Sequence, residues 1–170
     1  MLFYESKLPK VNSHIRFGLR YLHDAYFSEF LEKYIRPLLI KGVPSVIQEI
    51  KEFYTQPEKV KLIEAKLFAY FESMNKNMTL SSSDEEEQDP TVFLWLNYFI
   101  AQHYKFKGDA ANALKYVDAA IAHTPTLLEL YTLKGKIYSM AGDRKACSTL
   151  HEDARLLDTA DRAINAVSAM

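Results

Sequence analysis

The sequence predicts an all-α protein whose helices stack as antiparallel pairs in a right-handed α-solenoid. Apolar residues recur every three or four positions in several long stretches, which aligns them on one face of a helix. Two stretches in the C-terminal half also resemble each other at an offset of 34 residues. With 48% hydrophobic residues and only 5 glycines and 6 prolines among 170 residues, the composition favours helices over collagen-like or wholly disordered chains.

Residues 1–74 are predicted to form an N-terminal segment of three amphipathic helices. The first helix begins at Asp24, and Pro37 is expected to end or kink it. Pro44 is expected to open the second helix, because proline is favoured in a first turn. The apolar positions are Tyr26, Phe27, Phe30, Leu31, Tyr34 and Ile35 in the first helix, Val46, Ile47, Ile50, Phe53 and Tyr54 in the second, and Val60, Ile63, Leu67, Tyr70 and Met74 in the third.

Residues 75–91 are predicted to be a flexible acidic linker, because this run offers little apolar surface to offset the entropy of ordering it. Each serine of Ser81–Ser83 is followed three residues later by an acid, the pattern that acidophilic kinases prefer. A phosphate would add about −1.5 to −2 charges there. A solvated loop without a role is the alternative interpretation.

The repeat in the C-terminal half predicts two helix pairs, at residues 92–126 and 127–161, and the beginning of a truncated further repeat at 162–170. A period of 34 residues is that of tetratricopeptide (TPR) proteins. In both copies a Gly-Asp pair is expected to end the first helix and cap the second, at Gly108-Asp109 and Gly142-Asp143. Small residues are expected where helices cross, at Ala101, Ala113 and Ala120 and at Gly135, Cys147 and Ala154. Because a solenoid needs a capping neighbour, the chain is expected to be a fragment of a longer protein.

Charge and composition exclude several classes of protein. A net charge of −1 gives no bulk attraction to nucleic acid or anionic lipid, and no local basic patch is evident. The longest apolar stretch, residues 92–101, is too short to cross a bilayer. The lone Cys147 excludes an internal disulfide framework and, together with the N-terminal residues, favours a cytoplasmic protein.

No catalytic or metal-binding motif is found in the sequence. Cys147 and His151 lie one helical turn apart, but two ligands do not complete a metal site, so no metal is expected. Lys59, Lys61 and Lys66 are expected to lie on a solvated helix face. Nothing here predicts an enzyme.

In a TPR repeat the first helix of each pair lines the concave surface, so partner-binding residues are expected there. The candidates are Trp95, Tyr98, Gln102, Lys105 and Lys136. The surface around Trp95 is unusually apolar for an open groove, and cover by helices of the same chain is the equally weighted alternative.

Five short stretches of the chain carry a resemblance to a known family. They are residues Phe30–Pro37, Lys41–Ser45, Ala101–Tyr104, Thr124–Leu127 and Leu157–Arg162. Together they resemble the large auxiliary subunit of the NatA N-terminal acetyltransferase complex, from about Pro9 to the end of the chain. The second and fifth stretches are the most specific.

The resemblance implies a non-catalytic internal segment of a cytoplasmic TPR scaffold. Such scaffolds hold the catalytic acetyltransferase subunit, tune its choice of N-termini and anchor it to the ribosome. It also implies that acetyl-CoA binds only to the catalytic subunit, through an Arg/Gln-x-x-Gly-x-Gly/Ala loop that this sequence lacks. Trp95 is then expected to be buried, with Gln102 and Lys105 left accessible to the partner subunit.

Two alternatives remain open at the level of the sequence. One is a free-standing TPR adaptor that binds an extended peptide in its concave groove. The other, an unrecognised helical enzyme, would need a ligand-dependent thermal shift to support it.

Overall fold

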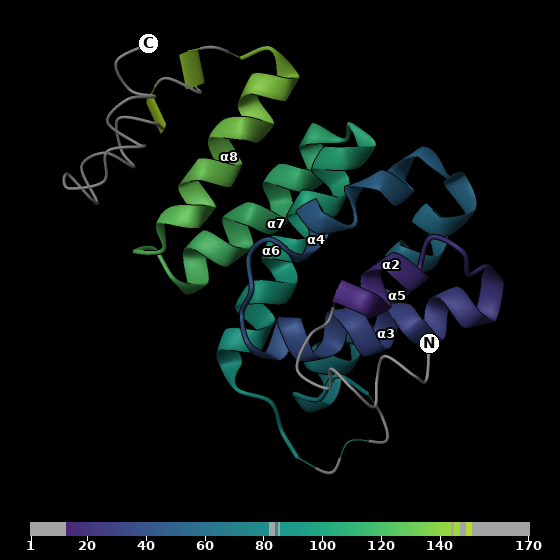
Figure 1. Cartoon of the computed structure of the whole chain (residues 1–170). Coiled ribbons are helices and arrows are strands. Elements are labelled where there is room, and N and C mark those ends of the chain that lie inside the picture. The colour runs from purple at the N-terminus through teal and green to yellow at the C-terminus, as the bar shows by residue number, and fades with distance from the viewer. Residues whose placement is uncertain (1–12, 82–83, 85, 144, 147–148, 151–170) are drawn as a thin grey trace. The chain divides into compact units, whose positions relative to one another are not determined.

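The computed structural model describes residues 13–81, 84, 86–143, 145–146 and 149–150. The chain divides into two compact units, residues 1–96 and 97–170. All regular structure in the described part is helical, which confirms the predicted all-α class (Figure 1). Cys147, Ala154 and the expected further repeat at 162–170 lie outside the described residues.

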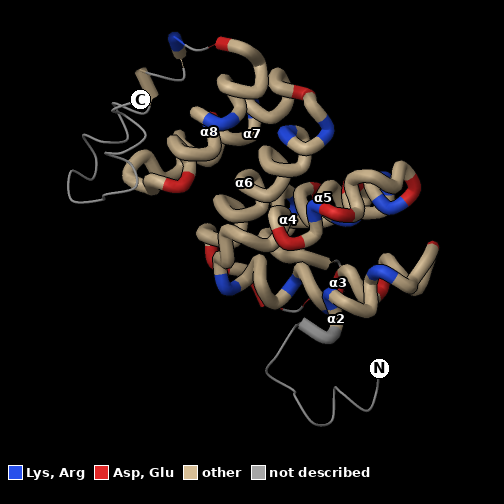
Figure 2. Tube along the Cα trace, turned by 45° about the horizontal axis from the view of Figure 1, so that its top comes forward, with Lys and Arg blue, Asp and Glu red and all other residues tan. Residues whose placement is uncertain are grey.

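The first unit is built around α3 and α5, which lie side by side. The short helix α2 packs on α3, and the 3₁₀ helix η1 packs on α5 (Figure 1). The elements are α2 (Ser13–Gly18), α3 (Asp24–Ile40), α4 (Val46–Glu49), η1 (Lys51–Thr55) and α5 (Pro57–Asn77). Figure 2 shows basic and acidic residues interspersed along α3 and α5, as expected for helices with one solvated side.

Helix α3 begins at Asp24, as predicted, but its buried face is narrower than the apolar pattern suggests. Phe27, Leu31 and Ile35 are fully buried, whereas Tyr26 is 69% exposed. Pro37 does not end the helix, which continues to Ile40. Proline removes only its own donor near the C-terminus, while the Pro37 carbonyl still accepts from the Lys41 N–H at 3.2 Å.

Helices α4 and α5 also begin close to prolines. Pro44 precedes the start of α4 at Val46 by two residues, and Pro57 occupies the first turn of α5. The predicted seam of α5 is buried at Ile63, Leu67, Tyr70 and Met74. The expectation that Lys59 lies on a solvated face is wrong, because this lysine is only 3% exposed.

The stretch 75–91 gives its first residues to α5 and its last two to α6. Met78 ends α5 in the left-handed conformation, with φ of 55°. The Gln88 N–H donates to the Met78 carbonyl at 2.7 Å, which closes the loop at its base, and Leu80 is buried. The flexibility of this loop stays a prediction.

Helix α6 (Pro90–Lys107) is apolar on all sides, as is typical of a helix covered by others. From Leu96 to His103 every residue is buried, including the polar Asn97, Gln102 and His103.

Helices α7 (Ala110–His123) and α8 (Leu128–Ala141) pack against each other in the second unit (Figure 1). A short connection joins them, so they run antiparallel. The predicted small contact residues Ala101, Ala113, Ala120 and Gly135 are all buried. Side chains of this size let helix backbones approach closely.

The two Gly-Asp turns have the same geometry, as predicted. Gly108 and Gly142 have φ of 80° and 82°, the left-handed conformation that favours glycine. The next N–H, of Asp109 or Asp143, donates to a carbonyl five residues earlier at 3.0 Å, in the Schellman pattern. Each aspartate then accepts, at 3.0 Å, the N–H of the third residue along, Asn112 or Ala146. The 34-residue repeat is therefore present in the backbone hydrogen bonds as well as in the sequence.

Candidate functional site

Four of the five expected partner residues lie on α6, namely Trp95, Tyr98, Gln102 and Lys105, and the fifth, Lys136, lies on α8. Tyr98 and Gln102 are 7% and 8% exposed. Trp95 and Lys105 are half-buried, and only Lys136 is exposed. The expectation that Gln102 is accessible is wrong, because α6 is buried around its whole circumference at this level.

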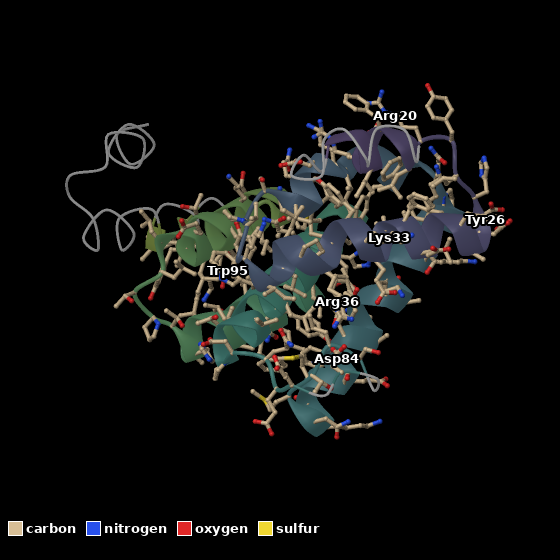
Figure 3. The ribbon with its side chains drawn as sticks, turned by 60° about the horizontal axis from the view of Figure 1, so that its bottom comes forward. Arg20, Tyr26, Lys33, Arg36, Asp84 and Trp95 are labelled. Carbon is tan, nitrogen blue, oxygen red and sulfur yellow. The ribbon has the colours of Figure 1, made fainter. Side chains whose placement is uncertain are left out.

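Trp95 rests on the turn between α3 and α4 (Figure 3). A Cβ atom on Gly42 would lie 2.3 Å from the indole Nε1, so no larger residue fits beneath the ring without a shift. Gly42 also has φ of 67°, which favours glycine independently. The Lys41–Ser45 turn, singled out in the sequence as specific, therefore has a packing role that spacing alone does not reveal.

Tyr98 and its surroundings are electrostatically apolar rather than reactive. Burial raises the pKa of the Tyr98 hydroxyl; a hydrogen bond from Gln102 opposes this, and the Glu129 carboxylate adds to it. Lys105 on the same helix has its Nζ 4.9 Å from the centre of the Phe106 ring. This chemistry suits packing and recognition, not proton transfer.

Lys136 and its neighbour Lys134 differ in their surroundings. Lys134 pairs with Asp118 of α7 at 2.7 Å, an ion pair that ties α8 to α7. Lys136 is exposed two residues further along. Of the five candidates it is the one whose side chain is presented to solvent.

A buried cation in the first unit was not predicted. The Lys59 Nζ donates to the carbonyls of Leu19 and Arg20 at 2.9 and 3.2 Å. It also lies 5.0 and 4.8 Å from the ring centres of Phe27 and Phe53. Burial lowers the pKa of this ammonium, while the Glu52 carboxylate acts in the opposite direction. The one signal in the sequence is that position 59 falls four residues before Ile63, in register with the apolar seam.

Glu49 is a second polar centre of the first unit. Its carboxylate accepts from the Tyr34 hydroxyl and the Ser45 hydroxyl, each at 2.7 Å, and pairs with Arg16 at 3.1 Å. Burial raises the pKa of this carboxyl, but the bonds from Tyr34, Ser45 and Arg16 outweigh it and the pKa is lowered. Burial raises the pKa of Tyr34 well above its ordinary value. The cluster ties α4 to α3 and to Arg16 of α2.

The loop after α5 is held to α3 by an ion pair. The Arg36 guanidinium donates to Asp84 Oδ1 at 2.5 Å (Figure 3). Asp84 Oδ2 accepts from the Ser81 N–H at 2.9 Å. The bond from Arg36 holds the pKa of the Asp84 carboxyl below its usual range. Of the predicted phosphorylation sites, Ser82 and Ser83 lie outside the described residues, and only Ser81 can be placed.

Neither a metal site nor a membrane span is found where the structure is described. Among those residues no three His, Cys, Asp or Glu side chains gather to hold an ion. Of the described helices, none is long and apolar enough to cross a bilayer.

Comparison with known proteins places these helices in a family. The family model described as "N-terminal acetyltransferase A, auxiliary subunit" matches residues 3–170. The chain is 41% identical over 150 residues to the N-terminal acetyltransferase A complex auxiliary subunit NAA15 of Arabidopsis thaliana, covering 88% of this chain and 17% of the relative. It is 38% identical over 162 residues to the mouse N-alpha-acetyltransferase 16, NatA auxiliary subunit, covering 95% of this chain and 19% of the relative.

A solved structure shows the same arrangement of helices. It is a structure of Naa15/Naa10 bound to HypK-THB, with a TM-score of 0.84 and 26% sequence identity. The match covers 98% of this chain and 24% of that one. The chain thus spans about a fifth of the length of the curated relatives that it matches. A family model that matches all but the first two residues, together with these relatives, shows that the chain belongs to the family of NatA auxiliary subunits.

Proposed function

We propose that this chain is a segment of a non-catalytic scaffold that holds the catalytic N-terminal acetyltransferase subunit of NatA. The observation that carries the proposal is the match to the auxiliary-subunit model over residues 3–170. The similar solved structure, which by its title contains Naa15 together with Naa10, supports the same partner. The acetyl-CoA loop expected on a catalytic subunit has no counterpart in this sequence.

The finer parts of the proposal concern the whole auxiliary subunit. In this view it tunes which N-termini the catalytic subunit accepts, and it anchors the complex to the ribosome in the cytoplasm. These roles fit a helical chain whose side chains form no metal cluster in the described ranges. Acetyl-CoA would then bind to the partner and not to this segment.

We propose Lys136 and Lys105 as the direct partner contacts among the five candidate residues. Lys136 is exposed, and Lys105 lies at the less buried end of α6. Trp95, Tyr98 and Gln102 would act indirectly, by setting the position of α6. Exposed charges at the edge of an interface mainly change the association rate and its salt dependence.

Calorimetric titration of the chain with the catalytic subunit tests the proposal. We expect saturable binding that Lys136→Glu weakens about three- to tenfold. Lys61→Glu is the matched control: it reverses another exposed lysine, on α5, and should leave the affinity unchanged.

Two outcomes would contradict the scaffold. One is absence of binding to the catalytic subunit combined with selection of extended peptides from a random library, which would favour the adaptor. The burial of Tyr98 and Phe99 argues against that outcome, because these side chains offer no open aromatic groove. The other is saturable binding of acetyl-CoA to the chain alone.

A further inference from the structure

The turn from Ser81 to Asp84 is closed by contacts at both ends and by α3. The Asp84 N–H donates to the Ser81 carbonyl at 3.1 Å, and the Ser81 N–H donates to Asp84 Oδ2 at 2.9 Å. The other carboxylate oxygen, Oδ1, accepts from Arg36 at 2.5 Å. Both oxygens of Asp84 are therefore engaged, and its side chain is only 14% exposed.

The same residues form a substrate pattern for an acidophilic serine kinase. Such a kinase needs a carboxylate three residues after the serine, and Asp84 has that position relative to Ser81. Glu86 and Glu87 add further acidic side chains, both exposed. The kinase reads the acid through its own basic residues, which must pair with the carboxylate. In the closed turn, Arg36 already occupies that carboxylate.

We propose that Ser81 is a phosphorylation site for an acidophilic serine kinase, and that Arg36 controls it by holding the Asp84 carboxylate that the kinase must read. The turn has to leave Arg36 before the serine can enter the kinase. There the γ-phosphoryl group of ATP is transferred to Ser81 Oγ: the new O–P bond forms, the bond from the γ-phosphorus to ADP breaks, and the hydroxyl proton passes to the kinase's catalytic carboxylate.

Arg36 also provides a receptor for the product. A phosphoserine dianion makes stronger charge-assisted hydrogen bonds to a guanidinium than a carboxylate does, so it takes the place of Asp84. A second donor is close by: the Tyr70 hydroxyl is buried and has no hydrogen-bond partner among the described residues. The charges of Arg36 and Asp84 both act on Tyr70, which places it beside the pair. Arg36 therefore restrains the turn before modification and binds the phosphate after it.

The test compares rates of Ser81 phosphorylation, resolved from Ser82 and Ser83 by mass spectrometry. The chain, its Arg36→Gln variant and a synthetic peptide spanning residues 76–92 are incubated with ATP and an acidophilic kinase that requires an acid at the third following position. We expect Arg36→Gln to raise the rate about three- to tenfold, the change in opening equilibrium for loss of one half-buried ion pair. The peptide, which lacks Arg36, should react at least as fast.

Two controls keep the result interpretable. Arg16→Gln removes an ion pair elsewhere in the first unit, that with Glu49, and should leave the rate unchanged. Arg36→Lys retains the charge with one point of contact and should give an intermediate rate. Far-UV circular dichroism verifies that each variant is folded.

Phosphorus NMR tests the product state. The second pKa of the Ser81 phosphate should lie below its ordinary value of about 6 in the parent chain and return to it in Arg36→Gln. No phosphate on Ser81 in the chain or the peptide would overturn the site. Equal rates in the parent and Arg36→Gln would overturn control by Arg36, and equal phosphate pKa values would overturn its role as receptor.

Discussion

Replacement of Lys59 by methionine tests whether the buried ammonium holds α2 to the rest of the first unit. Methionine keeps most of the length and apolar area of the side chain and removes the charge. The change deletes two hydrogen bonds from a charged donor, to the Leu19 and Arg20 carbonyls, and two ring contacts, to Phe27 and Phe53. Loss of stability is expected to be centred where α2 ends.

Two opposing effects set the size of the change in unfolding free energy. Each charged hydrogen bond contributes about 1.5–3 kcal/mol and each ring contact about 0.5–2 kcal/mol. Burying the ammonium costs several kcal/mol, about half of this gain or more, and methionine avoids that cost. The loss still dominates, because the two carbonyls are left without their donor while Leu19 remains fully buried. We expect a net destabilisation of about 2–4 kcal/mol.

Urea unfolding measures this effect, followed by the fluorescence of Trp95, the only tryptophan, which lies in the same unit as Lys59. Lys61→Met is the matched control: it changes an exposed lysine of the same helix and should shift stability by less than about 0.5 kcal/mol. Amide exchange at residues 18–22 should increase in Lys59→Met alone. If Lys59→Met were as stable as its control, the cost of burying the charge would equal everything its contacts provide, and the reasoning would be refuted.

Three further predictions concern packing and pH. Gly42→Ala should destabilise the chain by about 2–4 kcal/mol and shift Trp95 emission, because the methyl group meets the indole and φ is positive; Gly142→Ala, at positive φ in open space, should cost only about 1 kcal/mol, and equal losses would contradict the contact. Ala120→Leu should destabilise by about 1–3 kcal/mol, since Ala120 is fully buried, whereas the exposed Ala119→Leu should be nearly neutral in the same urea assay. Stability should fall as pH rises above about 10, because tyrosines with a raised pKa in the folded state bind their protons more tightly than in the unfolded chain; tyrosinate absorbance should then show a late phase coupled to unfolding, and a single phase near pH 10 would contradict burial. These tyrosines are Tyr34, Tyr54, Tyr70, Tyr98 and Tyr116.

The helices and the Gly-Asp turns could be predicted because their causes are local. A left-handed glycine followed by an aspartate cap depends on four or five consecutive residues, so Gly108 and Gly142 announce both turns in the sequence. Asp24 marks the start of α3 for a similar reason. The effect of Pro37 was harder to judge, since one missing donor near a helix end competes with burial of Leu39.

The side-chain contacts could not be predicted, because they join residues far apart in the chain. Lys59 is buried only because the ends of α2 and η1 meet around it, and no spacing rule brings those elements together. Gln102 was expected to be accessible because the repeat register was applied to α6 as to an outer helix. The apolar character of α6 on every side was the better guide to burial there.

The matching turns at Gly108 and Gly142 make the array modular at a defined period. Both junctions present the same left-handed glycine, the same carbonyl partners and the same aspartate cap, so a cut after each glycine leaves ends of the same geometry. Excising or duplicating residues 109–142 would therefore change the number of helix pairs by one without a new connection having to be invented. Such an array can lengthen or shorten in evolution, or at the bench, by a unit whose joints already fit.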